Sequence, residues 1–547
     1  MHLMITDITL RLNPASASNP TLVEKELTRK TGLMLRGNNN SASGKGIIND
    51  WRVIRKSIDA RQRQVMLNLT VRVATDNDTK ISATFSPVVF KVLPDAASQV
   101  IIVGAGPAGL FAALRAVELG LKPIVLERGK DVDSRRLDLA TINRTKKIIP
   151  NSNYCFGEGG AGAFSDGKLF TRSKKRGNVT DILNLLHQFG ASESILIDSH
   201  PHIGSDRLPI IIANIRKEII RCGGEFYFNT QMTDLLMSGD EVIGVIAVTE
   251  NENNEETVIR EFKGPVILAT GHSAHDVYRM LDRHDVTMEA KGIAMGVRLE
   301  HPQSLIDKIQ YHSPQGRGEY LPAAEYNFVT QVDGRGVYSF CMCPGGVIVP
   351  ASSSDNELVV NGMSASARAG GKANSGMVVE IRPGDFPEYT KHGKFEILEL
   401  QEQLEHKFFK AAGNSIVAPA QRMKDFIEGK DSSTLPTTSY IPGIQPARLD
   451  KLFPSAIAKR LQEGLKYFGK RCHGFATNEA ALIGLESRTS SPVRVPRNPD
   501  TLEHIAVKNL YPAGEGAGYA GGIVSAAIDG RRCVDSLFNK LNSNDIN

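Results

Sequence analysis

Three glycines and one glutamate have the spacing of a dinucleotide-binding site. Gly104, Gly106 and Gly109 form a GxGxxG pattern, and Glu127 follows them at about the 20-residue separation where a carboxylate accepts ribose hydroxyls. The first glycine permits a tight turn, the second lets the backbone approach a pyrophosphate, and the third lets a helix pack closely on a sheet. The pyrophosphate would lie at the helix N-terminus, where unpaired N–H groups and the helix dipole favour an anion. These residues predict a bound flavin or nicotinamide nucleotide.

The residues around this motif predict the βαβ unit that must position it. Residues 99–103 form a short apolar run rich in β-branched side chains, as expected for a buried parallel strand. A helix of small residues follows and ends at Gly120, and residues 122–126 predict the second strand. Strand, glycines, helix, strand and acid together are much more specific than a lone GxGxxG pattern.

Three further segments are predicted to face the same ligand. Residues 155–172 are rich in glycine, which costs backbone entropy and is tolerated mainly where backbone approaches a ligand; a surface loop is the alternative. Residues 265–276 predict a buried strand that runs into a turn at Gly271. Residues 510–513 predict a short strand, followed by an acid, a glycine turn and a helix that begins near Gly522, which makes another anion-favouring pocket.

Composition predicts a cytoplasmic protein of several domains. The 547 residues carry a formal net charge of +5, too small for the chain length to indicate a nucleic acid or a membrane surface as partner. The first residues are polar and charged, unlike a signal peptide, and no apolar stretch is long enough for a membrane span. Six scattered cysteines do not suggest a disulfide framework.

The order of the predicted elements divides the chain into four segments. The nucleotide motif begins near residue 98, so a separate domain precedes it, with strands at 4–12, 51–57 and 64–74, a helix at 21–31 and a flexible glycine-rich loop at 36–46. A helix at 207–221 and a β-meander precede the strand at residue 266. The segments are 1–97 (small N-terminal α+β domain), 98–290 (nucleotide-binding domain, first part), 291–471 (substrate or cap domain) and 472–547 (nucleotide-binding domain, C-terminal part).

The motifs together resemble flavoproteins of the glutathione-reductase-like superfamily, in the branch with one Rossmann fold and an interrupted FAD domain. More narrowly, FGEGGAGAFSDGKL, ILATGHSAHDVY, FCMCPGGVIVPA, ESRTSSPVRV and LYPAGEGAGYAGGI are similar to a group of bacterial FAD-dependent dehydrogenases. The resemblance covers nearly the whole chain from about residue 98. It implies FAD as cofactor and an α/β fold: a Rossmann-like FAD-binding domain with a three-stranded β-meander, an α+β substrate domain and a small N-terminal α+β domain.

The resemblance also assigns cofactor contacts by position. It implies that the GxGxxG glycines and Glu127 hold the ADP half, that Glu515 lies beside the ribityl chain or pyrophosphate, and that the last helix points its dipole at the flavin pyrimidine edge, where reduction places negative charge. The predicted cofactor-binding residues are Gly104, Gly106, Pro107, Ala108, Gly109, Glu127, Arg128, Gly159, Gly160, Gly162, Ser165, Gly167, Lys168, Ala269, Thr270, Gly271, Gly514, Glu515, Gly521, Gly522 and Ile523.

Four side chains are candidates for chemistry over the flavin. His272 follows the glycine turn and could act as a general base. Cys341 and Cys343 are two residues apart, so on a regular strand both thiols face one side; as thiolates they could relay electrons or attack a substrate, and buried packing is the alternative. The absence of a CxxxxC pair beside the nucleotide motif disfavours a disulfide reductase. Arg488 could clamp a substrate carboxylate, as could Arg494, or either could be paired structurally.

Other polar clusters are weaker candidates. His473 and Glu479 could enter the same pocket. His200, His202 and Asp206 suggest a metal site. Neither an HExxH helix nor a cysteine–histidine quartet accompanies them, so no metal is expected.

We therefore expect an FAD-dependent oxidoreductase that transfers a hydride between a small organic substrate and flavin N5. NAD(P)H or another electron carrier stays open as the electron partner. One alternative is an RNA-modifying flavoprotein whose N-terminal domain grips RNA through a basic and aromatic cluster; the other is a non-catalytic FAD-binding protein. The cluster consists of Trp51, Arg52, Arg55, Lys56, Arg61 and Arg63.

Overall fold

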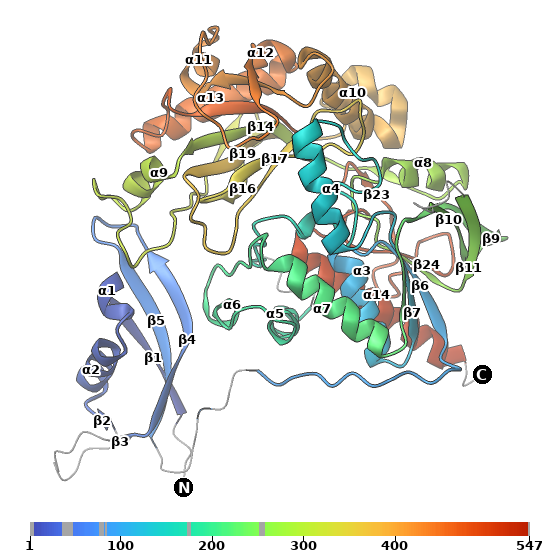
Figure 1. Ribbon diagram of the computed structural model, residues 1–547, viewed down its shortest axis with the longest axis horizontal. Helices are drawn as coiled ribbons and strands as arrows, with labels where there is room; N and C mark the ends of the chain where they lie inside the picture. The colour runs from blue at the N-terminus through green and yellow to red at the C-terminus, as the bar shows by residue number, and fades with distance from the viewer. Residues whose placement is uncertain are drawn as a thin grey trace.

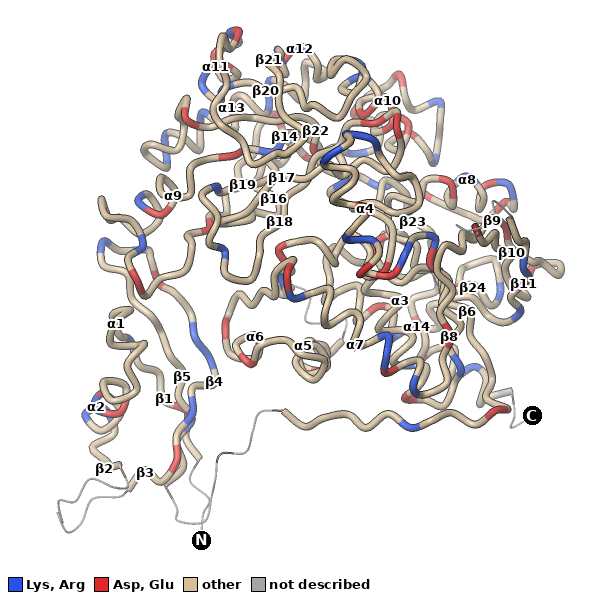
Figure 2. Tube along the Cα trace, in the orientation of Figure 1, with Lys and Arg blue, Asp and Glu red and all other residues tan. Residues whose placement is uncertain are grey.

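The computed structural model describes residues 5–35, 47–75, 81, 85–171, 177–250 and 257–544. Figure 1 shows a slender N-terminal unit at one side, an α/β unit around the nucleotide motif, and a third unit built on a large sheet. Acidic and basic residues are interspersed over all three units (Figure 2). The predicted glycine-rich loop at 36–46 lies outside the described residues.

A parallel sheet of five strands forms the centre of the α/β unit, in the order β24-β12-β6-β7-β8. β6 lies between β7, which follows it in the chain, and β12, which comes much later, so the strand order reverses beside β6. Ligands of such sheets bind beyond the carboxyl ends of the strands at this reversal. The strands are β24 (Leu510–Pro512), β12 (Val266–Leu268), β6 (Gln99–Val103), β7 (Lys122–Leu126) and β8 (Glu225–Tyr227).

The two faces of this sheet are covered by different elements. Val100 and Ile102 of β6 pack in a core with the helices of one face, whereas Ile101 and Val103 pack with the antiparallel meander and α8 on the other. Both faces are buried, which explains why β6 is a continuous apolar run. The helices are α3 (Pro107–Glu118), α4 (Val132–Thr145), α5 (Val179–Gln188), α6 (Ser194–Ile197), α7 (Leu208–Arg221), α8 (His275–Arg283) and α14 (Ile523–Asn544), and the meander is β9 (Thr230–Ser238), β10 (Glu241–Glu250) and β11 (Thr257–Lys263).

A sheet of seven strands forms the third unit, in the order β15-β16-β19-β14-β22-β20-β21. β22 pairs with β14 in its interior, so the sheet takes in a strand beyond the predicted boundary at residue 471. The strands are β15 (Val329–Val332), β16 (Arg335–Cys343), β19 (Lys372–Ile381), β14 (Ile293–Pro302), β22 (Ala481–Glu486), β20 (Ala418–Arg422) and β21 (Ile444–Pro446); the helices of the unit are α9 (Gln303–Gln310), α10 (Glu396–Ala411), α11 (Met423–Glu428), α12 (Leu449–Leu452) and α13 (Ser455–Arg471).

The N-terminal unit has a core of its own. Its sheet has the order β1-β5-β4, and alternate residues of β5 face the core with Val23 and Leu27 of the helix α2. Asn19 caps α2 by accepting from the Thr21 and Leu22 N–H groups, which is a favourable helix start. The elements are β1 (Ile5–Leu12), α2 (Pro20–Thr31), β4 (Asp50–Asp59) and β5 (Met66–Ala74).

The basic residues of β4 contact the α/β unit. Arg52 forms an ion pair with Glu193, and the Arg55 Nε donates to the Ser199 hydroxyl at 3.2 Å. The Ser199 N–H in turn donates to the Lys56 carbonyl at 2.9 Å. These contacts dock the N-terminal unit on the rest of the chain.

Among the described residues, none of the helices combines the length and apolar character that a bilayer crossing requires.

Candidate active site

A cavity of about 420 Å³ lies where the carboxyl end of β6, the glycine-rich segment and the start of α14 meet. Three of the predicted cofactor residues, Gly109, Gly159 and Gly514, do not line it. The predicted cofactor residues that line the cavity are Gly104, Gly106, Pro107, Ala108, Glu127, Arg128, Gly160, Gly162, Ser165, Gly167, Lys168, Ala269, Thr270, Gly271, Glu515, Gly521, Gly522 and Ile523.

The three glycines of the motif have the geometry that their predicted roles require. Gly104 has a φ of +100°, and a Cβ there would lie 2.5 Å from the Ala269 carbonyl oxygen. A Cβ on Gly109 would lie 1.8 Å from the Gly104 carbonyl oxygen, so only glycine lets α3 approach the strand so closely. Gly106 has no neighbour closer than 3.9 Å to such a Cβ, which leaves its backbone open to a ligand.

Glu127 is buried and organises the loops around the cavity. Its Oε2 accepts from the Ala105 N–H at 2.9 Å, and its Oε1 accepts from the Gly129 and Gly157 N–H groups at 2.9 and 3.0 Å. Both lone pairs of Oε1 are therefore used, whereas Oε2 has a further lone pair that a ribose hydroxyl could use. Glu127 thus has a structural role that was not predicted from the sequence.

Arg135 supports the glycine-rich segment, a role that the sequence analysis missed. Its Nη1 donates to the carbonyls of Gly157, Glu158 and Gly160 at 3.2, 2.8 and 2.8 Å, and its Nε donates to Asn153 at 2.8 Å. Burial lowers the pKa of Arg135 to about 10, which leaves it charged at neutral pH. Hydrogen bonds from the buried Arg135 guanidinium thus satisfy carbonyl groups of this segment and fix its conformation.

His272 and Glu515 face each other across the cavity wall. The His272 Nε2 lies 3.5 Å from the Glu515 Oε2, and the His272 Nδ1 is buried without a partner. Burial lowers the pKa of His272 to about 3, so the imidazole is neutral at physiological pH. Burial raises the pKa of Glu515 to about 7, and the nearby Cys341 adds to that rise.

The two candidate cysteines lie at a β-bulge rather than on a regular strand. Cys341 lines the cavity and has a φ of +43°; Cys343 is buried behind it. The neighbouring Cys343 thiol and the charges of Arg298 and Lys168 lower the pKa of Cys341. Sequence periodicity could not predict the bulge, because it depends on how β16 pairs with β19.

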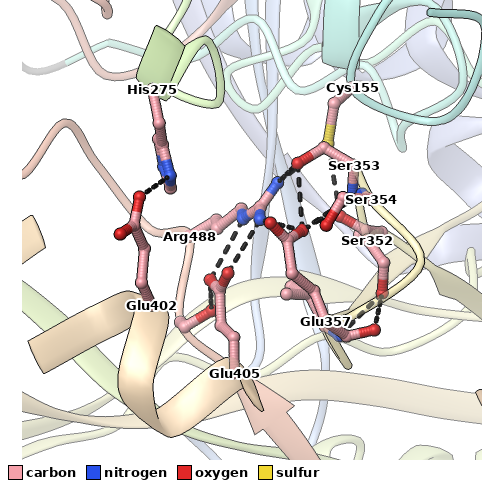
Figure 3. A network of polar contacts seen from close by, with 12 residues as sticks. Cys155, His275, Ser352, Ser353, Ser354, Glu357, Glu402, Glu405 and Arg488 are labelled. Carbon is pink, nitrogen blue, oxygen red and sulfur yellow. Dashed lines mark hydrogen bonds and ion pairs between the residues drawn. The ribbon is translucent and has the colours of Figure 1, made fainter. Parts of the chain in front are cut away.

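Arg488 is fully engaged by the protein itself (Figure 3). Its guanidinium donates to both Glu405 oxygens at 2.8 and 3.1 Å, to Glu357 at 2.6 Å and to the Ser353 hydroxyl at 2.7 Å. Arg488 is buried among these partners. Its geometry therefore supports structural pairing, the second of the two roles considered for it, over a carboxylate clamp.

The remaining candidates lie in other surroundings. His473 and Glu479 are exposed, and Arg494 lies over the Tyr519 ring with 5.7 Å between its Cζ and the ring centroid. Lys168 lines the cavity 3.3 Å from both Asp166 and Glu325. In the part of the chain that the structure describes, no group of three histidine, cysteine or acidic side chains is placed to hold a metal ion.

Known protein families match most of the chain. Family models match at residues 99–140 (FAD binding domain), at 292–489 (FAD-dependent protein, C-terminal domain-like) and at 4–74 (a domain of unknown function, DUF8436). A Clostridium beijerinckii protein, named only as an uncharacterized protein, is 37% identical over 558 residues, which cover 99% of each chain. The chain belongs to the family of this protein.

Solved structures are similar only at low identity. A geranylgeranyl bacteriochlorophyll reductase-like protein from Thermoplasma acidophilum is 12% identical, with a TM-score of 0.34 over 82% of this chain and 80% of that one. The glycerol-3-phosphate dehydrogenase from Bacillus halodurans, solved with FAD, is also 12% identical, with a TM-score of 0.35 over 82% of this chain and 66% of that one. These scores are too low to carry an argument about the substrate.

FAD is the cofactor of this chain. Family models for FAD-binding and FAD-dependent proteins match it, and the cavity fits the group on its own geometry. Gly271, with a φ of +73°, and Gly521 have open space where a Cβ would stand, so backbone on two sides can approach a ligand. The protein is accordingly a flavoenzyme of the oxidoreductase type.

Proposed function

We propose that the protein transfers a hydride between a small organic substrate and N5 of its FAD. The observation that carries the proposal is the continuity of one cavity: it runs from Gly104 and Gly106 of the nucleotide motif to His272, Glu515 and Cys341. A nucleotide held by the glycines therefore shares its space with side chains able to move protons. The placement in the glutathione-reductase-like superfamily is part of this proposal and rests on the sequence motifs.

Bound FAD supplies the two-electron chemistry, and the chain supplies orientation and proton transfer. In our proposal Glu127 and the two glycines between β6 and α3, Gly104 and Gly106, orient the ADP half of the cofactor. The N-terminus of α14, at Ile523, contributes a positive dipole end, which favours negative charge on the part of the cofactor that it faces.

His272 and Glu515 hold the proton. When Glu515 is ionised, its charge 3.5 Å from Nε2 favours the neutral tautomer with hydrogen on Nε2, which leaves the buried Nδ1 free as an acceptor. When Glu515 is protonated, that preference is lost and Nδ1 can carry the hydrogen. The protonation state of Glu515 thus decides whether His272 can act as a base.

The test is an absorption spectrum of the purified protein, identification of the released cofactor, and anaerobic titration with NADH and NADPH. We expect bound FAD. Bleaching by one of the nucleotides would identify the donor. FAD that stays oxidised with both nucleotides is then offered candidate substrates and thiols, and a flavin that nothing reduces would contradict the proposal in favour of a non-catalytic flavoprotein.

The His272→Gln variant tests the assigned base. We expect it to retain FAD and to lose about tenfold or more in the rate of flavin reduction by the substrate, as is typical for loss of a general base. His473→Ala is the matched control, because His473 is exposed. An unchanged rate in His272→Gln would remove His272 from the mechanism.

A further inference from the structure

A compressed stretch of β16 places two thiols together at the cavity. Phe340 pairs with Gly376 of β19, and Cys343 pairs with Asn374. Three residue steps on β16 therefore match two steps on β19, which cover about 6.6 Å. The extra residue is accommodated at the bulge around Cys341, whose positive φ is uncommon for a residue other than glycine.

This compression suits a disulfide between Cys341 and Cys343. Residues two apart on a fully extended strand lie close to the upper end of the Cα separation of about 4.4 to 6.8 Å that a disulfide spans, and a bulge shortens that separation. The Cys343 thiol donates to the Cys341 carbonyl oxygen at 3.3 Å, so the two residues already lie against each other. Both cysteines are free thiols in the structure.

One thiol of the pair is accessible from the cavity and the other is buried. Cys341 lines the cavity, whereas the Cys343 sulfur is buried and accepts from the Arg298 Nη2 at 3.2 Å. The same Nη2 donates to the Cys341 carbonyl at 2.7 Å. Arg298 itself is fully buried and paired with Glu486 at 2.9 Å, so its position is fixed.

The charges around Cys341 favour its thiolate. Arg298 and Lys168 are the cations nearby, and Asp166 opposes them; the Lys168 ammonium donates to the Met342 carbonyl, between the two cysteines. Thiolates, not thiols, attack disulfides. Cys341 therefore combines access, charge and a neighbouring thiol, which buried packing alone would not require.

We propose that Cys341 and Cys343 are a dithiol–disulfide couple that carries two electrons between the flavin and a small organic disulfide. The proposal rests on the proposed function: the small organic substrate gives its hydride to the flavin, and the organic disulfide is the acceptor of those two electrons. The Cys341 thiolate attacks one sulfur of the substrate disulfide, that S–S bond breaks, and the first product leaves as a thiolate that takes a proton from water. Cys343 then attacks the Cys341 sulfur, gives up its own proton and releases the second product thiol.

The result is one reduced substrate disulfide and one oxidised Cys341–Cys343 pair. Reopening the pair takes two electrons and two protons, and reduced FAD in the same cavity carries the electrons. His272 and Glu515, on the wall of that cavity, are placed to return a proton to Cys341.

The first test counts electrons in an anaerobic dithionite titration of the FAD-loaded protein after mild oxidation with diamide. We expect about four electrons per protein, because flavin and disulfide each take two. Cys341→Ser and Cys343→Ala should each take about two. Cys472→Ser, a half-buried cysteine outside the cavity, is the matched control and should keep about four. A wild-type count of about two would overturn the couple.

The second test does not use the flavin. FAD-stripped protein is oxidised with diamide, alkylated with iodoacetamide before and after dithiothreitol, and digested for peptide masses. We expect alkylation of Cys341 and Cys343 only after dithiothreitol. Both alkylated without reductant would contradict the couple, even in a protein that binds FAD and turns it over. Failure to bind FAD, with the protected pair intact, would instead contradict the proposed function alone.

The third test addresses the substrate. Reduced wild-type protein should react rapidly with 5,5′-dithiobis(2-nitrobenzoic acid) and release two thionitrobenzoates for each reagent molecule that the pair consumes, and Cys341→Ser should lose that fast phase. A circular dichroism spectrum checks that each variant is folded. A fast phase that survives in Cys341→Ser would assign the reactive thiol elsewhere and overturn the proposal.

Discussion

Burial decides the protonation states of His272 and Glu515, two neighbouring residues of the site. His272 is neutral because burial disfavours its cation, and Glu515 titrates near neutrality because burial disfavours its anion. The glycines of the nucleotide motif could be predicted from the sequence, because a left-handed turn or a very close backbone contact admits only glycine. The support from Arg135 could not, because its four carbonyl partners are brought together only by the folded loop.

The tautomer of His272 should change with pH. Above the Glu515 pKa of about 7, the carboxylate 3.5 Å from Nε2 favours hydrogen on Nε2, and below that pKa the preference is lost and hydrogen shifts toward Nδ1. Nitrogen-15 NMR of histidine-labelled protein should therefore show the Nδ1 signal of His272 move through a midpoint near pH 7, while the ring stays neutral.

Glu515→Gln removes the titrating group and should abolish that midpoint. Glu479→Gln is the control, because Glu479 is exposed. A midpoint that persists in Glu515→Gln would mean that another group sets the tautomer.

At the scale of elements, the strands and helices of the nucleotide motif could be predicted closely. β6 and β7 have the predicted bounds, and α14 begins within a residue of the predicted start, because apolar runs and glycine turns mark them locally. The bulge in β16 depends on the register with β19, and β22 joins a sheet whose other strands lie far away in sequence. Those features are decided by tertiary pairing.

Close packing of α14 on α3 should be needed for the cavity to form. A Cβ on Gly530 would lie 2.0 Å from the Ala108 carbonyl oxygen, so Gly530→Ala must push the helices apart. We expect a loss of about 1 to 3 kcal/mol in the free energy of unfolding, as for other overpacked cores, and weaker FAD binding, since Ala108 lines the cavity.

Urea unfolding and FAD titration measure the two effects of Gly530→Ala. Gly371→Ala is the control, because a Cβ at Gly371 meets nothing within 4 Å. Equal stability of the two variants would show that the helices can relax without cost.

At the scale of the whole molecule, the FAD cavity is closed by two units that the chain visits alternately. The α/β unit supplies the glycines, and the large-sheet unit supplies Cys341 from β16 and Arg488 just after β22. Sequence motifs located the first unit twice, before and after the second. They placed β22 in the first unit, because its apolar character is that of a strand in the α/β sheet.

Arg488 joins parts of the chain that are distant in sequence, and its removal should therefore act on stability before it acts on catalysis. Glu405 comes from α10 and Glu357 from the loop after residue 350, and both lie against the guanidinium. Breaking a buried pair by removing one partner leaves uncompensated charge and costs about 3 to 5 kcal/mol. We expect that loss in urea unfolding of Arg488→Met, whereas Arg494→Met, at an exposed arginine, should unfold like the wild type. A carboxylate clamp predicts the opposite pattern, with normal stability and a raised KM for an acidic substrate, so the two measurements together decide which role Arg488 has.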